Sequence, residues 1–452
     1  MKLIYNIKDK PPFGQLIVFA IQQLLAIMTA TLVVPVIIGN GMSPSAALFG
    51  AGLGTLVYVL FTKASSPVFL GSSFAFINSM FVAFAGGVSM SLGYLGLIIG
   101  AIFAGLVYVV IALIVKLVGV GWINKLMPAV VIGPTVSIIG LSLAGNAVGD
   151  ILKGNLTSEA GQLASPFACL LCGVITLIVV ALCSTFGKKT VRMIPFIIGI
   201  LAGYAVAAVM TAIGYAVDYD AIKILNIAPI TDLVKDGVTL STFVTMPDFT
   251  FLTAWKGVGE LNATYIGTIA VAYIPVAFVV FAEHIADHKN ISSIIENDLL
   301  EQPGLSRTLL GDGVGSMVGA FFGGCPNTTY GESVGCVAIS ACASVYTVIA
   351  AAVLALLVAF ISPFVAFVNT IPSCVMGGVC MTLYGFIAVS GLKMIQAVDL
   401  NENKNLFVVS TILIAGIGGL SLTFGKVNLT SIACALILGI VINLILKDKK
   451  AQ

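Results

Sequence analysis

Long apolar runs, separated by short polar segments, follow one another along nearly all of the 452 residues. One helical crossing of a bilayer core about 30 Å thick requires about 20 apolar residues. Only 9% of the residues are charged and the mean hydropathy is +1.13, whereas a soluble domain carries about 25% charged residues. These values exclude a soluble globular protein and predict a polytopic membrane protein embedded in a lipid bilayer.

We predict fourteen membrane segments and therefore an all-α integral membrane fold. Segments three and ten are too short for a full helical crossing. The predicted segments cover residues 15–38, 46–61, 68–83, 95–118, 127–143, 167–186, 194–213, 265–282, 309–322, 328–340, 345–368, 374–389, 406–422 and 430–446.

The distribution of Lys and Arg predicts the orientation of these segments. With the lysine-rich N-terminus in the cytoplasm, alternation of sides puts the basic clusters on the cytoplasmic side, as the positive-inside rule requires. Both termini are then expected in the cytoplasm, and residues 146–165 and 218–260 outside it. The polar start, with no small-residue cleavage pattern after it, favours a retained first segment over a cleaved signal peptide.

Charge and cysteine usage narrow the expected partners. A net charge of +2 is too small to suggest a nucleic-acid partner. The nine cysteines lie in or beside apolar runs without metal-ligand grouping, and we interpret them as small apolar packing residues. We expect neither a metal nor a cofactor.

Short matches recur in the same order in the two halves of the chain. An odd number of segments per half inverts the second copy, an organisation common among secondary transporters. We therefore predict inverted repeats of seven segments at 1–217 and 261–452, joined by an extracytoplasmic connection at 218–260. The matches are 52–57 with 313–318, 72–76 with 328–332, and Pro128 and Gly133 with Pro372 and Gly377.

The two short segments occupy equivalent places in the two halves. Paired interrupted apolar segments point to a binding site near the bilayer midplane. The free N–H groups at the start of a half-helix carry partial positive charge and can donate to carbonyl oxygens of a small solute. We expect half-helices from segments three and ten to meet at midmembrane.

Two glutamates lie in or beside apolar segments. A charged residue at membrane depth costs about 2.5 to 3.5 kcal/mol and usually faces protein or a water-filled pathway. Glu332 lies in the polar stretch 325–335, and Glu283 closes segment eight; together they form a candidate carboxylate pair. The alternatives place Glu332 in a loop outside the bilayer and Glu283 at a solvated helix end beside Asp287 and His288.

Other polar side chains near these segments allow two interpretations each. His284 either relays protons or satisfies a neighbouring carbonyl, whereas we expect His288 to be solvated at the membrane interface. Gln22 and Gln23 either bind neighbouring helices or contact a substrate.

Aromatic and acidic groups together favour a neutral planar solute. Carboxylates accept from N–H groups, half-helix amides donate to C=O groups, and the rings of Phe74, Tyr330 and Tyr384 could stack on a planar ring. A cyclic imide meets all three demands. An inorganic anion meets them poorly because the carboxylates would repel it.

At these residues the chain resembles the nucleobase–cation symporter family that includes the nucleobase–ascorbate transporters, and in particular its bacterial uracil permease branch. The similarity covers nearly the whole chain, and the string 326–332 is its most specific part. The matching residues are Gln22, Ala30 and Pro35, 71–77, 282–284, 326–332 and 383–385.

The resemblance implies roles for individual residues. Glu283 and Glu332 are implied to hydrogen-bond uracil, and backbone amides at Phe74 and Gly331 to contact it. It also implies that Ala30, Tyr330 and Tyr384 shape the pocket. Our own candidates for proton coupling are Glu283, His284 and Asp287, and we expect five polar residues to support the pocket: Gln22, Gln23, Ser73, Asn327 and Thr328.

The resemblance also implies a mode of action. A core domain, about 13–120 and 261–368, would move against a gate domain, about 121–217 and 369–447, in a homodimer of the bacterial cytoplasmic membrane with H⁺ as coupling ion. Two positions depart from the family pattern: relatives often have His where Gln23 stands, and some have His where Asp287 stands.

These observations give a leading hypothesis and two alternatives. We expect a uracil:proton symporter that works by alternating access. A xanthine or urate permease of the same family is the first alternative, and an anion exchanger or channel on the same architecture is the second. An enzyme is not expected, because two histidines and no nucleophile–base set leave little from which to build a catalytic centre.

Overall fold

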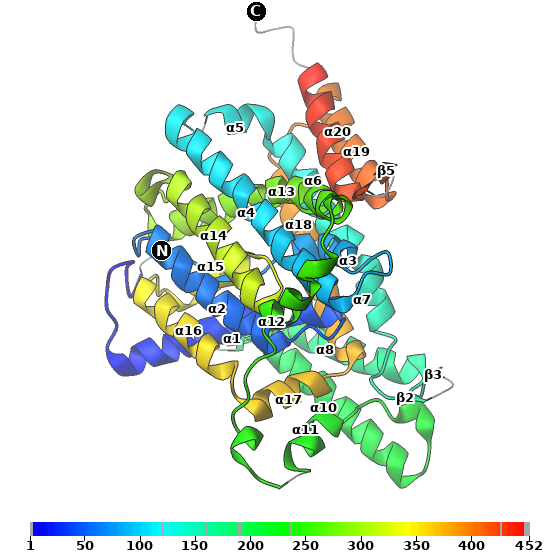
Figure 1. Ribbon diagram of the computed structural model, residues 1–452. Helices are drawn as coiled ribbons and strands as arrows, with labels where there is room; N and C mark the ends of the chain where they lie inside the picture. Colours follow the sequence, from blue (N-terminus) through cyan, green and yellow to red (C-terminus); the bar gives the residue numbers. More distant parts are fainter. Residues whose placement is uncertain are drawn as a thin grey trace, which may run out of the picture.

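A computed structural model gives the fold of residues 3–119, 121–158, 161–188, 191–192, 194–235, 237–424 and 427–446 (Figure 1). The described chain is mostly helical. The helices are α1 Phe13–Ile38, α2 Pro44–Phe61, α3 Ile77–Ala83, α4 Met90–Val118, α5 Gly121–Leu126, α6 Ala129–Ser142, α7 Ala144–Asp150, α8 Pro166–Phe186, α10 Pro195–Ala216, α11 Ala228–Thr231, α12 Thr250–Ala254, α13 Ala263–Ile295, α14 Leu305–Gly323, α15 Gly331–Ser340, α16 Val345–Val358, α17 Ser362–Thr370, α18 Ser373–Ile395, α19 Asn403–Ile417 and α20 Ser431–Ile445. The strands are β1 Leu70–Ser72, β2 Thr157–Ser158, β3 Gly161–Gln162, β4 Asn327–Thr329, β5 Leu422–Phe424 and β6 Val427–Leu429.

Eight helices within the described residues are long and apolar enough to cross a membrane, with α6 and α7 counted together. Helices suit lipid because every backbone polar group is satisfied inside the segment. Several begin after a hydroxyl or amide side chain that caps a free N–H group. Such caps are Ser43 before α2, Ser89 before α4, Ser165 before α8, Asn262 before α13 and Thr430 before α20.

Two predicted segments have the wrong boundaries. Segment eight was expected to end at residue 282, but α13 continues to Ile295, because neighbouring helices bury the polar residues that follow the apolar run. Segment eleven was expected as one span over 345–368, but the helix breaks between Val358 and Ser362, so that α16 and α17 are separate.

The helices pack in two groups. In the first, α2 and α14 lie side by side (Figure 1), and α4 packs on α14, α16 on α2, α1 on α16 and α13 on α4. In the second, α6 packs on α18, α8 on α10 and α18, and α19 on α6 and α20. Fewer contacts join the groups, chiefly those of α13 with α6 and α20 and those of α1 with α10 and α18.

Glycines bring α2 and α14 together. A Cβ on Gly50 would lie 2.4 Å from the Gly319 carbonyl oxygen, and one on Gly54 would lie 2.6 Å from that of Gly315. Small residues at helix contacts let backbones approach closely within a membrane. Gly54 and Gly315 belong to the recurring motifs 52–57 and 313–318, so these motifs of the two halves pack directly on each other.

A short antiparallel ladder joins the two predicted short segments. Strands β1 and β4 pair with Leu70 opposite Thr329, Gly71 opposite Thr328 and Ser72 opposite Asn327, and all six residues are buried. The ladder is extended by hydrogen bonds from Ser73 N to Pro326 O, 2.9 Å, and from Tyr330 N to Phe69 O, 3.2 Å. Non-helical backbone is tolerated at membrane depth only where protein satisfies it, and the ladder meets that condition. A short helix follows each strand: the 3-10 turn Phe74–Phe76 leading into α3 after β1, and α15 after β4.

Candidate functional site

A cavity of about 340 Å³ lies where α13 and α15 face α6, α10 and α18. This volume is in the range of small-molecule sites, which are concave and apolar with a few well-placed polar groups. The lining residues are Val136, Phe196, Glu283, Ala286, Asp287, Asn290, Gly331, Glu332, Leu383, Phe386, Ile387, Ser390 and Met394. Four of the lining residues are exposed, so the cavity is open to the surface: Asn290, Gly331, Phe386 and Ser390.

Helix α13 presents a polar stripe to the cavity. Glu283, Asp287 and Asn290 are four and three residues apart, a spacing that stacks side chains on one helix face. Along this stripe Glu283 is half-buried, Asp287 is buried and Asn290 is exposed. The stripe therefore offers oxygen atoms to a small solute in the cavity.

Helix α15 contributes its first two residues, Gly331 and Glu332. Glu332 lies in the first turn of the helix, where a carboxylate interacts favourably with the helix dipole. The first N–H groups of a helix have no intrahelical acceptor and can donate to a ligand. The cavity thus combines carboxylate acceptors with the donor end of a helix.

Asp287 is the best anchored carboxylate of the cavity. Its Oδ2 accepts a hydrogen bond from Thr329 Oγ1 at 2.8 Å, and Thr329 belongs to β4. The carboxyl group is thus tied to the ladder that joins the two halves of the chain.

The ionisable side chains of the described cavity lining are all acidic. Three carboxylates line the cavity, and no Lys, Arg or His is present among the described lining residues. Close carboxylates repel an anion and disfavour holding all their negative charges at once. The lining therefore suits a neutral solute with N–H donors, together with protons or another cation.

His284 points away from this cavity into a buried polar network. Its Nδ1 lies 2.7 Å from Asp312 Oδ2 and its Nε2 lies 3.0 Å from Thr308 Oγ1. Both His284 and Asp312 have 0% exposed side chains. The imidazole therefore links α13 to α14, and His284 does not line the cavity.

The expectation that His288 is solvated is wrong. The residue is 0% exposed. Its Nδ1 donates to the His284 carbonyl oxygen at 2.8 Å, and its Nε2 lies 2.7 Å from the Tyr58 hydroxyl of α2. The position after an apolar run suggested a membrane interface, but α13 continues through it and α2 covers the side chain.

Two of the five predicted supporting residues hold the fold together, and three have a polar atom without a protein partner. Gln23 Nε2 donates to Ser333 Oγ and so links α1 to α15, and Asn327 Nδ2 donates to the Gly50 carbonyl oxygen at 3.2 Å. Gln22 Oε1, Ser73 Oγ and Thr328 Oγ1 are buried without a protein hydrogen-bond partner. These three polar groups are the ones left free to bind water or a solute.

The three predicted pocket-shaping residues and Phe74 do not line the cavity. Ala30 is buried in α1. Tyr330 donates from its hydroxyl to the Ser72 carbonyl oxygen at 2.7 Å. The rings of Phe74 and Tyr384 meet edge to face with centroids 5.8 Å apart, and Tyr384 lines a separate cavity of about 140 Å³. Substrate contacts of these four residues stay a prediction.

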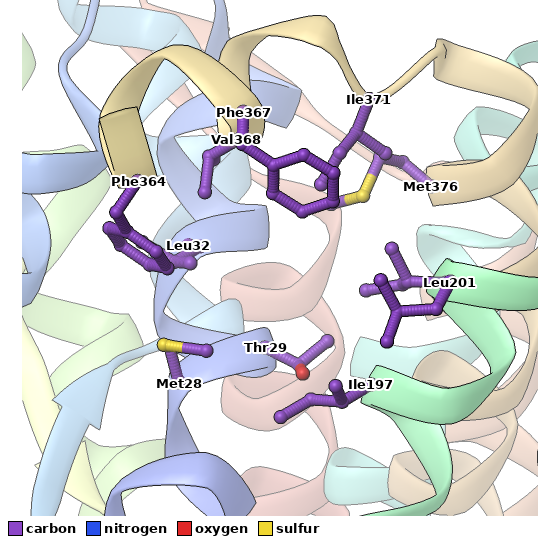
Figure 2. A pocket seen from close by; sticks show the side chains of 11 residues that line it. Met28, Thr29, Leu32, Ile197, Leu201, Phe364, Phe367, Val368, Ile371 and Met376 are labelled. Carbon is purple, nitrogen blue, oxygen red and sulfur yellow. The ribbon is translucent and has the colours of Figure 1, made fainter. Parts of the chain in front are cut away.

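A third cavity shows why shape alone does not identify the site. About 60 Å³ in volume, it lies between α1, α10, α17 and the start of α18 (Figure 2). Met28, Leu32 and Leu201 are typical of its lining, and Thr29 supplies the one hydroxyl in view. It is too small and too apolar for a polar ring, so it marks an apolar seam between the two helix groups.

Sequence reasoning missed several residues of the site and its surroundings. Asn290 and Ser390 line the cavity, Thr329 anchors Asp287, and Asp312 pairs with His284. Continuing the helical spacing from Glu283 and Asp287 would have found Asn290. The partners Thr329 and Asp312 depend on tertiary contacts that have no local sequence signal.

The packed apolar helices, the buried ladder and the acidic cavity between the two helix groups define a multi-pass membrane transporter. Solved structures share this architecture. The transmembrane domain of the cyanobacterial bicarbonate transporter BicA matches with a TM-score of 0.59 at 14% identity, over 97% of this chain and 100% of that one. SLC26A9 matches with a TM-score of 0.62 at 12% identity, over 95% of this chain and 64% of that one.

The sequence comparisons identify the family within that class. A family model described as a permease family (Xan_ur_permease) matches residues 14–425, and the chain belongs to this family. The uracil permease of Bacillus caldolyticus is 38% identical over 99% of this chain and 96% of its own length. Those of Bacillus subtilis and Escherichia coli are 35% and 34% identical, over 100% and 98% of this chain and 97% and 94% of their own lengths.

Proposed function

We propose that this protein imports a nucleobase, uracil, by proton symport with alternating access. The observation that carries the proposal is that Glu283, Asp287 and Glu332 share one cavity with the first turn of α15. Similarity to uracil permeases over nearly the whole chain supports the choice of substrate.

The chemistry of uracil suits this lining. Its ring carries two N–H donors and two C=O acceptors. We assign the N–H groups to Glu283 and Glu332, and a carbonyl oxygen to the backbone N–H group of Gly331 at the start of α15. Hydrogen bonds to charged groups are worth about 1.5 to 3 kcal/mol each, so the two glutamates supply most of the affinity and the specificity for an imide.

Protons complete the cycle in this proposal. Moving uncompensated charge through a dry interface is costly. Binding of uracil and of a proton at the acidic cavity lowers that cost, and Glu283 and Asp287 are our candidates for the proton acceptor. His284 stays a candidate for proton relay only through its pairing with Asp312.

The alternating movement is assigned to the two helix groups. The group of α1, α2, α4, α13, α14 and α16 corresponds to the core domain at 13–120 and 261–368, and the group of α6, α8, α10, α18, α19 and α20 to the gate domain at 121–217 and 369–447. The sparse contacts between the groups support this division. We propose fourteen segments in two inverted repeats, with the short helices α3 and α15 as the half-helices.

The proposed setting is the bacterial cytoplasmic membrane, with both termini in the cytoplasm and a homodimer as the working assembly. In that orientation, the end of the cavity near Asn290 and Ser390 faces the cytoplasm.

Charge-neutral substitution of the two glutamates tests the proposal. Glu283→Gln and Glu332→Gln each keep the shape of the side chain but remove the negative acceptor, so we expect accumulation of labelled uracil in proteoliposomes to fall about tenfold or more. Glu301→Gln, at an exposed position, is the matched control and should transport like the wild type. Wild-type accumulation by both cavity variants would refute the assigned roles.

Competition separates the alternatives. Excess unlabelled uracil should abolish uptake of the label, whereas excess xanthine or urate should leave most of it. Inhibition by xanthine instead would reassign the site to a purine base. The likeness to BicA and SLC26A9 concerns the fold, and the acidic lining disfavours an anion; uptake driven by an opposing bicarbonate gradient would overturn the symport.

A further inference from the structure

A further cavity of about 520 Å³ lies where the end of α13 and the start of α14 meet the N-terminal segment. We call it the basic pocket. Its lining comes from three separate parts of the chain: the segment before α1, the link between α2 and β1, and the stretch from the end of α13 into α14. Nothing in the proposed transport cycle uses this cavity.

Three cations line the basic pocket, one from each of these parts: Lys8, Lys63 and Arg307. Among the described residues, none of the three forms a salt bridge. The one carboxylate of the described lining belongs to Asp9, and its Oδ2 accepts from the backbone N–H of Asn6 at 2.7 Å. Three positive charges therefore face one negative charge, and a concave surface with such an excess attracts an anion.

Neutral donors complete the lining. The side-chain amides of Asn6, Asn297 and Gln302 line the basic pocket, and all three residues are exposed, so their N–H groups can donate to a ligand. Phosphate oxygens accept from amide, ammonium and guanidinium groups alike, and a guanidinium group binds two of them at once. The donor set of this pocket is therefore the one that a phosphate group requires.

The backbone at Lys63 is held in an uncommon conformation at the end of α2. Lys63 and Ala64 have φ angles of 51° and 52°, in the left-handed region that few non-glycine residues adopt. Lys63 N donates to the Leu60 carbonyl oxygen at 3.2 Å, and Ala64 N donates to that of Val59 at 2.9 Å. Backbone in such regions persists only where the surrounding structure holds it, and it is common at ligand-binding sites.

The N-terminal segment is held by hydrogen bonds as well. Ala343 N donates to the Tyr5 carbonyl oxygen at 2.9 Å, and Val345 N donates to that of Ile7 at 3.0 Å, so the segment lies along the link between α15 and α16. Lys8 follows directly. A ligand bound to the three cations therefore joins three parts of one helix group, the group of α1, α2, α13 and α14.

We propose that the basic pocket binds the phosphate group of an organic phosphate ester, with Lys8, Lys63 and Arg307 as the charged contacts. A volume of about 520 Å³ is in the range of small-molecule sites, so the organic part of the ester has room beside the phosphate. In the proposed orientation the pocket faces the cytoplasm. The ester there is a free phosphate ester or the headgroup of an anionic lipid.

Thermal unfolding of the full-length purified protein in detergent tests the site with glycerol 3-phosphate as the probe. A ligand that binds only the folded protein raises the midpoint of unfolding. We expect a rise of about 2 °C or more at saturation and none with glycerol. The rise should shrink as NaCl is added, because salt screens exposed charges.

Two double variants show whether the rise comes from the basic pocket, because phosphates also stabilise proteins without a site. Lys63→Gln with Arg307→Gln removes two of the three cations and should lose the rise. Lys116→Gln with Lys188→Gln removes the same charge at exposed positions outside the described lining and should keep it. Equal rises in the wild type and the pocket variant would overturn the site for the free ester.

Reconstitution in nanodiscs distinguishes the two sources of the phosphate. Phosphatidylglycerol added to phosphatidylcholine should raise the midpoint of the wild type, and not that of the pocket variant, where the ester is a lipid headgroup. A rise that depends on Lys63 and Arg307 with either probe supports the proposal, which fails if neither probe gives one. Neither readout involves uracil, so absent uracil uptake by the wild type would refute the proposed function and leave this site standing.

Discussion

Under the proposed function, substitution of Asp287 should separate substrate binding from proton coupling. Asn at this position keeps an oxygen that accepts from Thr329 but cannot bind a proton. We predict that Asp287→Asn retains uracil binding within about threefold, a free-energy change under 1 kcal/mol, and loses concentrative uptake. Equilibrium binding and proteoliposome uptake measure the two quantities.

Thr329→Val provides the comparison for that substitution. It removes the hydrogen bond that Asp287→Asn keeps and leaves the carboxylate, so we expect uptake to remain concentrative. Wild-type accumulation by Asp287→Asn would assign the coupled proton to another group.

Substitution of Asp312 should change the stability of the folded protein, because this residue pairs with His284 between α13 and α14. Removing one partner of a buried hydrogen bond leaves the other group unsatisfied and costs about 1 to 3 kcal/mol, and His284 and Asp312 are both fully buried. We predict that Asp312→Ala lowers the midpoint of thermal unfolding in detergent by several degrees. Asp232→Ala, at an exposed position, should leave the midpoint unchanged, and equal midpoints for the two variants would contradict the prediction.

At the scale of elements, the β1–β4 ladder tolerates no added side chain at Gly71. A Cβ there would lie 2.4 Å from the Tyr330 ring and 2.9 Å from Thr31 Oγ1. Overpacking of this kind costs about 1 to 3 kcal/mol. We predict that Gly71→Ala lowers both thermal stability and uracil uptake, because a displaced Tyr330 shifts the start of α15.

Gly335→Ala is the matched substitution for that test. No atom lies within 4 Å of a Cβ at this position of α15, and Ala stabilises a helix interior by about 0.5 to 1 kcal/mol relative to Gly. Thermal unfolding should therefore shift in opposite directions for the two variants. A loss of stability in both would mean that α15, rather than the ladder, is the sensitive element.

Elements also show what sequence could and could not predict. The long helices were predictable because lipid leaves an apolar run few alternatives to a helix. Glu283 and Glu332 stood out because charge is rare in such runs. The end of α13 was not predictable, since Glu283, Asp287 and His288 look alike in sequence whether water or protein surrounds them. The β1–β4 pairing joins residues distant in the chain, so no local sequence pattern predicts it.

At the scale of the whole molecule, the acidic cavity and the sparse seam between helix groups predict a response to the proton gradient. With an acidic exterior, protonation at the outer side and release at the inner side should drive uracil above its external concentration. We predict that a protonophore abolishes this accumulation. Exchange of internal unlabelled for external labelled uracil in preloaded vesicles needs no gradient, so it should continue.

That exchange is the control for the pH experiment. Accumulation that survives the protonophore and depends on external sodium would identify sodium, instead of the proton, as the coupling ion.

The apolar cavity in Figure 2 is consistent with movement of the two helix groups against each other, because an apolar surface with one hydroxyl can shift without breaking many hydrogen bonds.

The ladder of Leu70–Ser72 with Asn327–Thr329 also bears on how the transporter is made. The first strand leaves the ribosome long before the second, so the N-terminal half enters the bilayer with backbone groups that lack their hydrogen-bond partners. The translocation machinery or water must satisfy these groups until the C-terminal half is inserted. A cell that produced the halves as separate polypeptides would obtain a working carrier only after the two found each other in the membrane.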